Sequence, residues 1–301
     1  MVSTTKWGSS VSRPVLVAFV VAAFLASGFF APNANAVITS ITLNDPTGGE
    51  MWRGTQNITW SQTGGVSGDL VTISISLDGG ATYNTLITSS ADGVSGTYAW
   101  DTNNTAAGAL LDGSVYRIKV VSGLGLDSSS TNFMVDNAKP VTSITIPAPT
   151  GLDSWYTVVP TITLTCNDGA GSGCLAGGTK YRWNGFIGGY NTYAGPFAAP
   201  QGINTLEWYS EDQAVDALGA HNIETVQTQT IKVDTILPTV AVTSTTVPGA
   251  YNAGDDINIT LTFSEPVSST GALNVNLNSG GSCSVPILTN ATTGTCTYTV
   301  L

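Results

Sequence analysis

The hexapeptide Val135-Asp136-Asn137-Ala138-Lys139-Pro140 returns 98 residues later in the chain as Val233-Asp234-Thr235-Ile236-Leu237-Pro238. Each copy ends a run of strand-forming residues, and a new run of the same kind follows each proline. A pattern that recurs at a fixed period is typical of a chain built from similar parts in series. The shared pattern V-D-x-x-x-P therefore marks two boundaries between such parts.

The segments on either side of these boundaries alternate between apolar and polar residues. The clearest examples are Val71–Leu77, Tyr116–Val120 and Ile257–Phe263. Period 2 predicts strands that place one face on a core and the other in solvent. Turn signals such as Asp78-Gly79-Gly80 separate the strands. Short strands in parts of about 100 residues are typical of immunoglobulin-like β-sandwiches.

We therefore expect an all-β chain of tandem immunoglobulin/fibronectin-like β-sandwiches. The expected sandwiches cover residues 37–135, 138–234 and 238–301. The third range is short and stops inside a run of strand-forming residues, so we expect it to be an incomplete sandwich and the chain to belong to a longer protein.

Residues 1–36 have the features of a secretion signal. Lys6 and Arg13 form a positive start, Val15 to Phe30 is almost entirely apolar, and Ala34-Asn35-Ala36 is a cleavage signal of the A-x-A type. The alternative is an uncleaved membrane anchor, for which the apolar stretch is short. We expect a secreted or cell-surface protein with no membrane span in its mature part.

The charge balance limits the classes of partner. The sequence has 9 Lys and Arg against 20 Asp and Glu, a net charge of −11 at pH 7. A nucleic-acid-binding protein needs a basic footprint, and anionic lipid attracts basic segments. The expected partner is therefore a glycan or protein of the cell envelope or extracellular space, and not a nucleic acid.

Four cysteines follow the signal, at positions 166, 174, 283 and 296. An even number in a secreted chain predicts disulfides. Cys166 and Cys174 flank a glycine-rich loop, and Cys283 and Cys296 flank a hairpin-like turn, so we predict these two local pairs. The alternative, a zinc site, lacks the usual C-x-x-C spacing and histidines.

The first sandwich contains G-G-E-M-W-R-G-T-Q-N-I-T-W (48–60), L-D-G-G (77–80), G-T-Y-A-W (96–100) and Y-R-I-K-V (116–120). It resembles the N-terminal domain of the Ser/Thr-rich, GPI-anchored, yeast cell-wall-synthesis type, which also occurs in bacterial surface proteins. This resemblance implies a sandwich fold and no catalytic residues.

The second sandwich contains L-T-C-N-D-G-A-G-S-G-C (164–174) and Y-S-E-D-Q-A-V-D-A-L-G-A-H-N-I-E (209–224). It resembles bacterial extracellular Ig-like repeats that end in Y-S-x-D-x-A-G-N-x-E, with an insertion in the A-G-N turn. The third contains G-A-Y-N-A-G-D-D-I-N-I-T-L-T-F-S-E-P-V (249–267) and resembles the Ig-like repeats of large bacterial adhesins.

No cofactor is expected to be required, and calcium is the one candidate. Asp136 and Asp234 lie at the two boundaries, where a carboxylate can meet loop oxygens from both neighbours. Asp168 and Asp212 lie in loops of the second sandwich. Calcium takes oxygen ligands from carboxylates and carbonyls. The alternative is that these aspartates only cap turns.

Aromatic residues are dense in the second sandwich, and Trp183, Trp208 and Tyr209 are candidates for stacking on a glycan. The alternative is that they fill the core, as most aromatic residues of a sandwich do. Trp208 and Tyr209 are adjacent and so face opposite sides of their strand. At least one of the two is expected to point outward.

The patterns of catalytic chemistry are weak. His221 is the only histidine and is expected in a loop without a nucleophile nearby. Glu207 with Glu211 or Asp212 could form the carboxylate pair of a glycosidase, but Glu207 lies within an expected strand. We therefore expect a non-catalytic stalk or adhesin. The alternatives are a glycan-binding protein and the accessory region of a longer secreted hydrolase.

Overall fold

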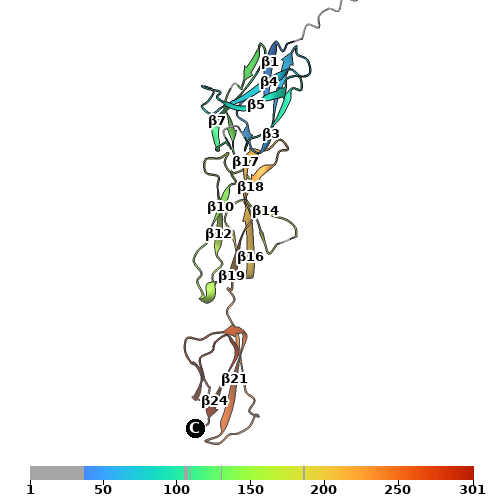
Figure 1. Cartoon of the computed structure of the whole chain (residues 1–301). Helices are drawn as coiled ribbons and strands as arrows, with labels where there is room; N and C mark the ends of the chain where they lie inside the picture. The colour runs from blue at the N-terminus through green and yellow to red at the C-terminus, as the bar shows by residue number, and fades with distance from the viewer. Residues whose placement is uncertain (1–36, 105–107, 109, 130, 186) are drawn as a thin grey trace, which may run out of the picture. The chain divides into compact units, whose positions relative to one another are not determined.

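The computed structural model describes residues 37–301 except 105–107, 109, 130 and 186 (Figure 1). The expected signal peptide lies outside the described residues. The described part is built from β-strands and one 3-10 helix, η1 (Leu152–Ser154). None of the helical structure in this part is long and apolar enough to span a membrane. The all-β prediction is confirmed.

The chain separates into two compact units. Unit 1 contains residues up to 141 together with 166–178 and 210–224, and unit 2 contains 142–165, 179–209 and 225–301. The strands of unit 1 are β1 (Ser40–Asp45), β2 (Met51–Trp52), β3 (Thr55–Thr63), β4 (Leu70–Ser76), β5 (Thr85–Asp92), β6 (Thr97–Asp101), β7 (Gly113–Ser122), β8 (Gly125–Ser128), β9 (Phe133–Val135), β17 (Glu211–Val215) and β18 (His221–Ile223).

Unit 1 is a sandwich of two sheets. One sheet has the order β1-β3-β6, and the other has the order β18-β17-β2-β9-β7-β4-β5 with β8 beside β7. The alternation predicted for Val71–Leu77 is confirmed, because Val71, Ile73 and Ile75 are fully buried. Each such side chain contributes about 1.5–3 kcal/mol by leaving water. Trp52, Trp60 and Trp100 join the same core.

The G-G-E-x-W motif forms the turn that leads into β2. The carboxylate of Glu50 accepts hydrogen bonds from the backbone N–H groups of Thr47 and Gly48. Gly48 has a φ of 121°, and a Cβ there would lie 1.8 Å from Oγ1 of Thr131. Only glycine fits both restrictions. The turn directs Trp52 into the first core, 5.1 Å from the ring of Phe133.

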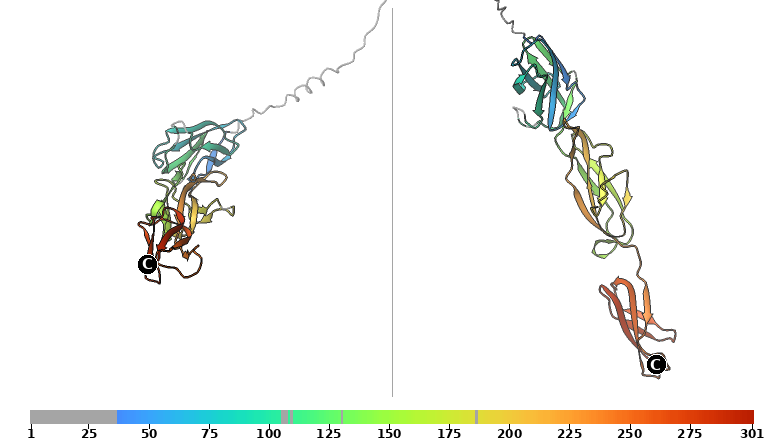
Figure 2. Two further views of the ribbon diagram at one scale, coloured as in Figure 1. Left: turned by 90° about the horizontal axis from the view of Figure 1, so that it is seen from below. Right: turned by 90° about the vertical axis from the view of Figure 1, so that its right-hand side faces the viewer.

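The hairpin of β17 and β18 completes the second sheet of unit 1. Val215 pairs in parallel with Trp52 of β2, which pairs in parallel with Val135 of β9. Figure 1 shows this hairpin at the lower end of the strands of unit 1, and Figure 2 shows unit 1 from two further directions. Residues from the 209–224 motif thus lie next to the first V-D-x-x-x-P segment.

Unit 2 contains two further cores, each between two sheets. Its strands are β10 (Val141–Thr145), which begins at the last residue before the unit, β11 (Trp155–Tyr156), β12 (Thr161–Asn167), which ends in unit 1, β13 (Lys180–Trp183), β14 (Asn191–Thr192), β15 (Phe197–Ala198), β16 (Gly202–Tyr209), β19 (Gln227–Val233), β20 (Val240–Thr243), β21 (Asp256–Val267), β22 (Leu273–Asn276), β23 (Ser282–Val285) and β24 (Ala291–Thr299).

The second core lies between the sheets β10-β12-β15 and β11-β19-β16-β13-β14. The third lies between the sheets β20-β21-β24 and β22-β23. The predicted alternation along β21 is confirmed by the buried Ile259 and Leu261. The predicted disulfides are both present, and Cys283–Cys296 joins β23 to β24 across the third core.

Candidate metal centre

Three of the four aspartates expected to bind calcium lie together in unit 1. Asp136, Asp168 and Asp212 each have a carboxylate oxygen within 4.8 Å of the other two. Asp136 and Asp212 are 0% exposed. We call these three residues the acidic triad. They come from segments that are far apart in the sequence, so their meeting is a property of the fold.

Asp136 directly follows β9. Its N–H donates to the carbonyl of Trp52, which continues the pairing of β2 and β9. Its Oδ2 accepts a hydrogen bond of 2.6 Å from the N–H of Ser172, whereas its buried Oδ1 has no hydrogen-bond partner in the part of the chain that the structure describes. A carboxylate buried in this way carries an unsatisfied acceptor, which costs free energy.

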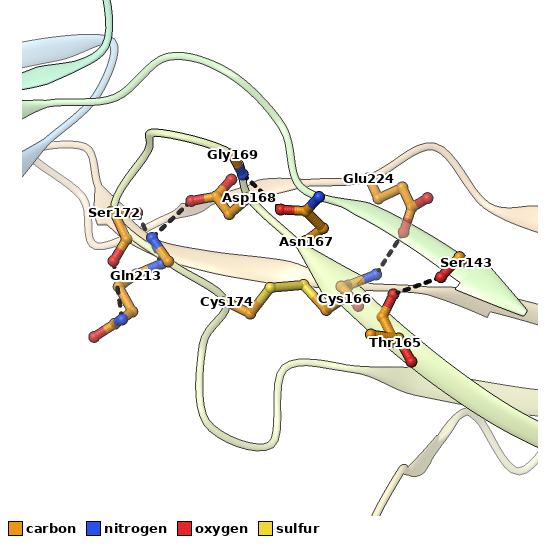
Figure 3. Close-up of a disulfide and its surroundings, with 12 residues drawn as sticks. Ser143, Thr165, Cys166, Asn167, Asp168, Gly169, Ser172, Cys174, Gln213 and Glu224 are labelled. Carbon is orange, nitrogen blue, oxygen red and sulfur yellow. Dashed lines mark hydrogen bonds between the residues drawn. A yellow bond between two sulfur atoms is a disulfide. The ribbon is translucent and has the colours of Figure 1, made fainter.

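Asp168 lies in the loop that the Cys166–Cys174 disulfide closes (Figure 3). Its Oδ2 accepts from the N–H of Gly173 at 2.7 Å, and its buried Oδ1 finds no hydrogen-bond partner among the described residues. A Cβ on Gly171 would lie 2.6 Å from Oδ2 of Asp168 and 2.7 Å from Oδ2 of Asp136. The loop therefore needs glycine at this position to let the two carboxylates approach.

Asp212 lies in β17, and its backbone forms a bridge with Cys174. Its Oδ1 accepts from the N–H groups of Ala214 and Asn222, and its Oδ2 accepts from the side-chain amide of Asn222 at 2.7 Å. That amide also donates to the carbonyl of Asp136 at 3.0 Å. Asn222 thus fixes the orientation of two triad residues.

The electrostatics of the triad are unfavourable for three ionised groups. Burial, together with the charges of Asp136 and Asp168, raises the pKa of Asp212 to about 6, although the hydrogen bonds from Asn222 act to lower it. Burial also raises the pKa of Asp168, with a contribution from Asp136. Among the described residues, the ion pairs are Arg53–Asp216 and Arg182–Glu207, so no Lys or Arg neutralises the triad.

The residue types at this centre suit a hard cation. Carboxylate oxygens are the ligands that calcium and magnesium prefer, and zinc favours the nitrogen and sulfur ligands that the group lacks. The carboxylates of Asp136 and Asp168 each offer an oxygen that accepts no hydrogen bond from any residue described in the structure. Further oxygens would have to come from nearby backbone, Asp212 or water.

The fourth expected ligand, Asp234, does not belong to the triad. It lies in unit 2, where its Oδ1 accepts hydrogen bonds from the side chain of Gln201 and the N–H of Ile236. This is the turn-capping role that was the alternative interpretation. The two copies of the hexapeptide therefore place their aspartates in different surroundings.

Two residues that organise the centre were missed as site residues from the sequence. Ser172 bonds to Asp136 through its N–H, and its hydroxyl accepts from the N–H of Ala214 at 2.9 Å. Asn222 bonds to Asp136 and Asp212. A signal for Asn222 was available, because it is the asparagine of the Y-S-x-D-x-A-G-N-x-E pattern. The insertion forms the turn of the β17–β18 hairpin, and this hairpin brings Asn222 back beside Asp212.

The residues considered for catalysis are held in structural contacts. The carboxylate of Glu207 accepts from Arg182 at 2.7 Å and from the hydroxyl of Tyr190 at 3.1 Å. His221, expected in a loop, instead lies half-buried in β18, where no described residue forms a hydrogen bond with its buried ring nitrogen Nδ1. Asp212, the other candidate for a carboxylate pair, belongs to the triad.

The candidate glycan-binding residues have different surroundings. Trp208 is 5% exposed in the second core and donates from its indole to the carbonyl of Thr142, so the expectation that it stacks on a glycan is not supported. Trp183 packs against the same core. Tyr209 is half-buried, with its ring 4.8 Å from that of Tyr190 in an edge-to-face contact.

No family model matches this chain, and no curated protein matches it. Among solved structures, it is similar to the fibronectin(III)-like modules of CbhA from Clostridium thermocellum. The identity is 19%, the TM-score is 0.29, and the match covers 64% of this chain and 94% of the other. The fold assignment therefore depends on the strand pairing, not on this similarity.

Proposed function

We propose that this chain is a secreted, non-catalytic protein of the cell envelope, in which successive β-sandwiches form a stalk or adhesin. The observation that supports this proposal is the presence of three hydrophobic cores that follow one another along the chain and share no residue. Sandwiches in series separate two ends of a protein without needing a common core.

The local chemistry is consistent with a non-catalytic role. Glu207 is bound by Arg182 and Tyr190, and the single histidine is part of a strand. The two disulfides suit an oxidising compartment, where secreted domains use them as cross-links. The acidic composition keeps such a surface soluble and unattractive to nucleic acid.

The location is tested on intact cells that produce the protein. We expect the mature chain to begin at Val37 and to be digested by a protease added outside the cells, while a cytoplasmic marker stays intact. N-terminal sequencing and an antibody against residues 37–301 provide the readouts. A chain that retains residues 1–36 and is protected from the protease would refute the proposal.

A glycan-binding module is the second candidate, favoured by one cluster in unit 2. The guanidinium of Arg182 lies 4.3 Å from the ring centre of Tyr190, which contacts Tyr209 edge to face. Aromatic rings beside an ion pair can stack on a sugar and hydrogen-bond its hydroxyl groups. Binding to envelope polysaccharide that decreases at least tenfold in Tyr209→Ala, but not in Tyr83→Ala, would favour this function.

A further inference from the structure

We propose that the acidic triad of Asp136, Asp168 and Asp212 binds one calcium ion, and that the Cys166–Cys174 disulfide holds Asp168 in position for it. This site is independent of the proposed function. It would join the segment that follows β9, the disulfide loop and the β17 strand within unit 1.

The first observation that supports this site is that a fully buried carboxylate, that of Asp136, has an oxygen that accepts no hydrogen bond from the described residues. Asp136 is 0% exposed, yet its Oδ1 has no hydrogen-bond partner among the described residues. Buried carboxylates are normally paired, hydrogen-bonded or bound to a metal. Because no described Lys or Arg pairs with the triad, a cation from solution is the missing partner.

The second support is the preorganisation of the carboxylates. The N–H of Ser172 holds Asp136, the N–H of Gly173 holds Asp168, and the amide of Asn222 holds Asp212. Each of these hydrogen bonds occupies one oxygen and fixes its carboxylate. Such outer contacts orient metal ligands, and their loss typically costs 10–100-fold in metal affinity.

The ligand chemistry selects calcium among the common divalent ions. Zinc prefers imidazole and thiolate, and the cysteine of this loop is held in a disulfide. Magnesium demands near-ideal octahedral geometry and keeps several waters. Calcium accepts irregular sets of carboxylate and carbonyl oxygens, which suits carboxylates from three separate segments.

The loop between Cys166 and Cys174 explains why breaking their disulfide should weaken the binding of calcium. Between Cys166 and Cys174 the chain carries three glycines, which have the greatest backbone freedom when the loop is open. The disulfide closes this loop, and both Asp168 and the N–H donor Ser172 lie inside it. Without the bond, the loop gains conformational freedom that calcium would have to remove on binding.

The test is isothermal titration of oxidised residues 37–301 with CaCl2 at pH 7.5, after removal of metal with EGTA. We expect one ion per chain, and an affinity at least tenfold lower in Asp136→Asn, Asp168→Asn and Asp212→Asn. Asp234→Asn is the matched control and should bind as the parent does. Titrations with MgCl2 and ZnCl2 should show weaker binding.

Two results would overturn the calcium site: no binding at millimolar CaCl2, which would mean that protons neutralise the triad, or equal loss of affinity in Asp234→Asn. Circular dichroism checks that each variant is folded, and Asp168→Asn changes the least buried of the three carboxylates. Tighter binding of magnesium or zinc would overturn the choice of ion.

The role of the Cys166–Cys174 disulfide is tested separately with two double variants. The double variant Cys166→Ser/Cys174→Ser should bind calcium at least tenfold more weakly, whereas Cys283→Ser/Cys296→Ser should bind as the parent does. Unchanged affinity in the first double variant would refute the role of the disulfide. An equal loss in the second would show a general effect of lost stability instead.

Discussion

Replacing Asn222 with alanine should remove three of the hydrogen bonds that connect the β17–β18 hairpin to the rest of unit 1 and fix Asp212 within it. The side chain is 3% exposed and makes three hydrogen bonds. It donates to Oδ2 of Asp212 at 2.7 Å and to the carbonyl of Asp136 at 3.0 Å, and it accepts from Nε of Arg53 at 2.5 Å.

The loss of stability expected in Asn222→Ala can be estimated from these three hydrogen bonds. Hydrogen bonds to charged groups contribute about 1.5–3 kcal/mol each, and neutral ones about 1 kcal/mol. Arg53 keeps its bonds to Asp216 and the carbonyl of Ala220, so part of its contribution survives. We therefore expect Asn222→Ala to lower the free energy of opening of the hairpin by about 3 kcal/mol.

The assay is native-state hydrogen exchange of residues 37–301 with EGTA present, read from peptides that cover β17, β18 and β9. Asn44→Ala is the control, because Asn44 is exposed and bonds only to Ser61 in the same unit. It should change the opening free energy by less than about 0.5 kcal/mol. A loss below about 1 kcal/mol in Asn222→Ala, or no coupling with Arg53→Met, would refute the reasoning.

Three further predictions concern other parts of the chain. Hydrogen bonds from Ser76 and Thr82 lower the pKa of Asp78 from its ordinary 3.8 to about 2. The stabilisation by the ionised carboxylate is therefore present above pH 4 and is lost as the pH falls through 2. The urea midpoints of the parent and of Asp78→Asn should differ at pH 5 and converge near pH 2. Trp208→Ala should destabilise the second core by about 3–5 kcal/mol, against less than about 1 kcal/mol for Tyr209→Ala, as measured by thermal unfolding. Cys283→Ser/Cys296→Ser should destabilise the third core by about 3 kcal/mol through lost loop-closure restriction, and an unchanged unfolding midpoint would contradict this.

The strands were predictable because their signal is local. The alternation over Val71–Leu77 places every second side chain on one face, and the burial of Val71, Ile73 and Ile75 follows from that period alone. The disulfides were predictable for a similar reason, since each pair encloses a short loop.

The candidate site was only half predictable. The sequence singled out Asp136, Asp168 and Asp212, but it treated Asp234 as equivalent to Asp136 because both occupy the same place in the hexapeptide. In the structure, Asp136 faces the disulfide loop and Asp234 caps a local turn. The two aspartates differ because different segments of the chain pack against the two copies of the hexapeptide.

The all-β class, the strand faces and the disulfide pairs could be predicted from the sequence, because they depend on period 2 and on short loops. The pairing of Val215 with Trp52, through which the β17–β18 hairpin extends the sheet of unit 1, became visible only in the folded chain. That pairing carries Asp212 and Asn222 to Asp136 across the chain. Parallel pairing between distant segments leaves no local pattern, since its register is set by backbone hydrogen bonds that any residue can make.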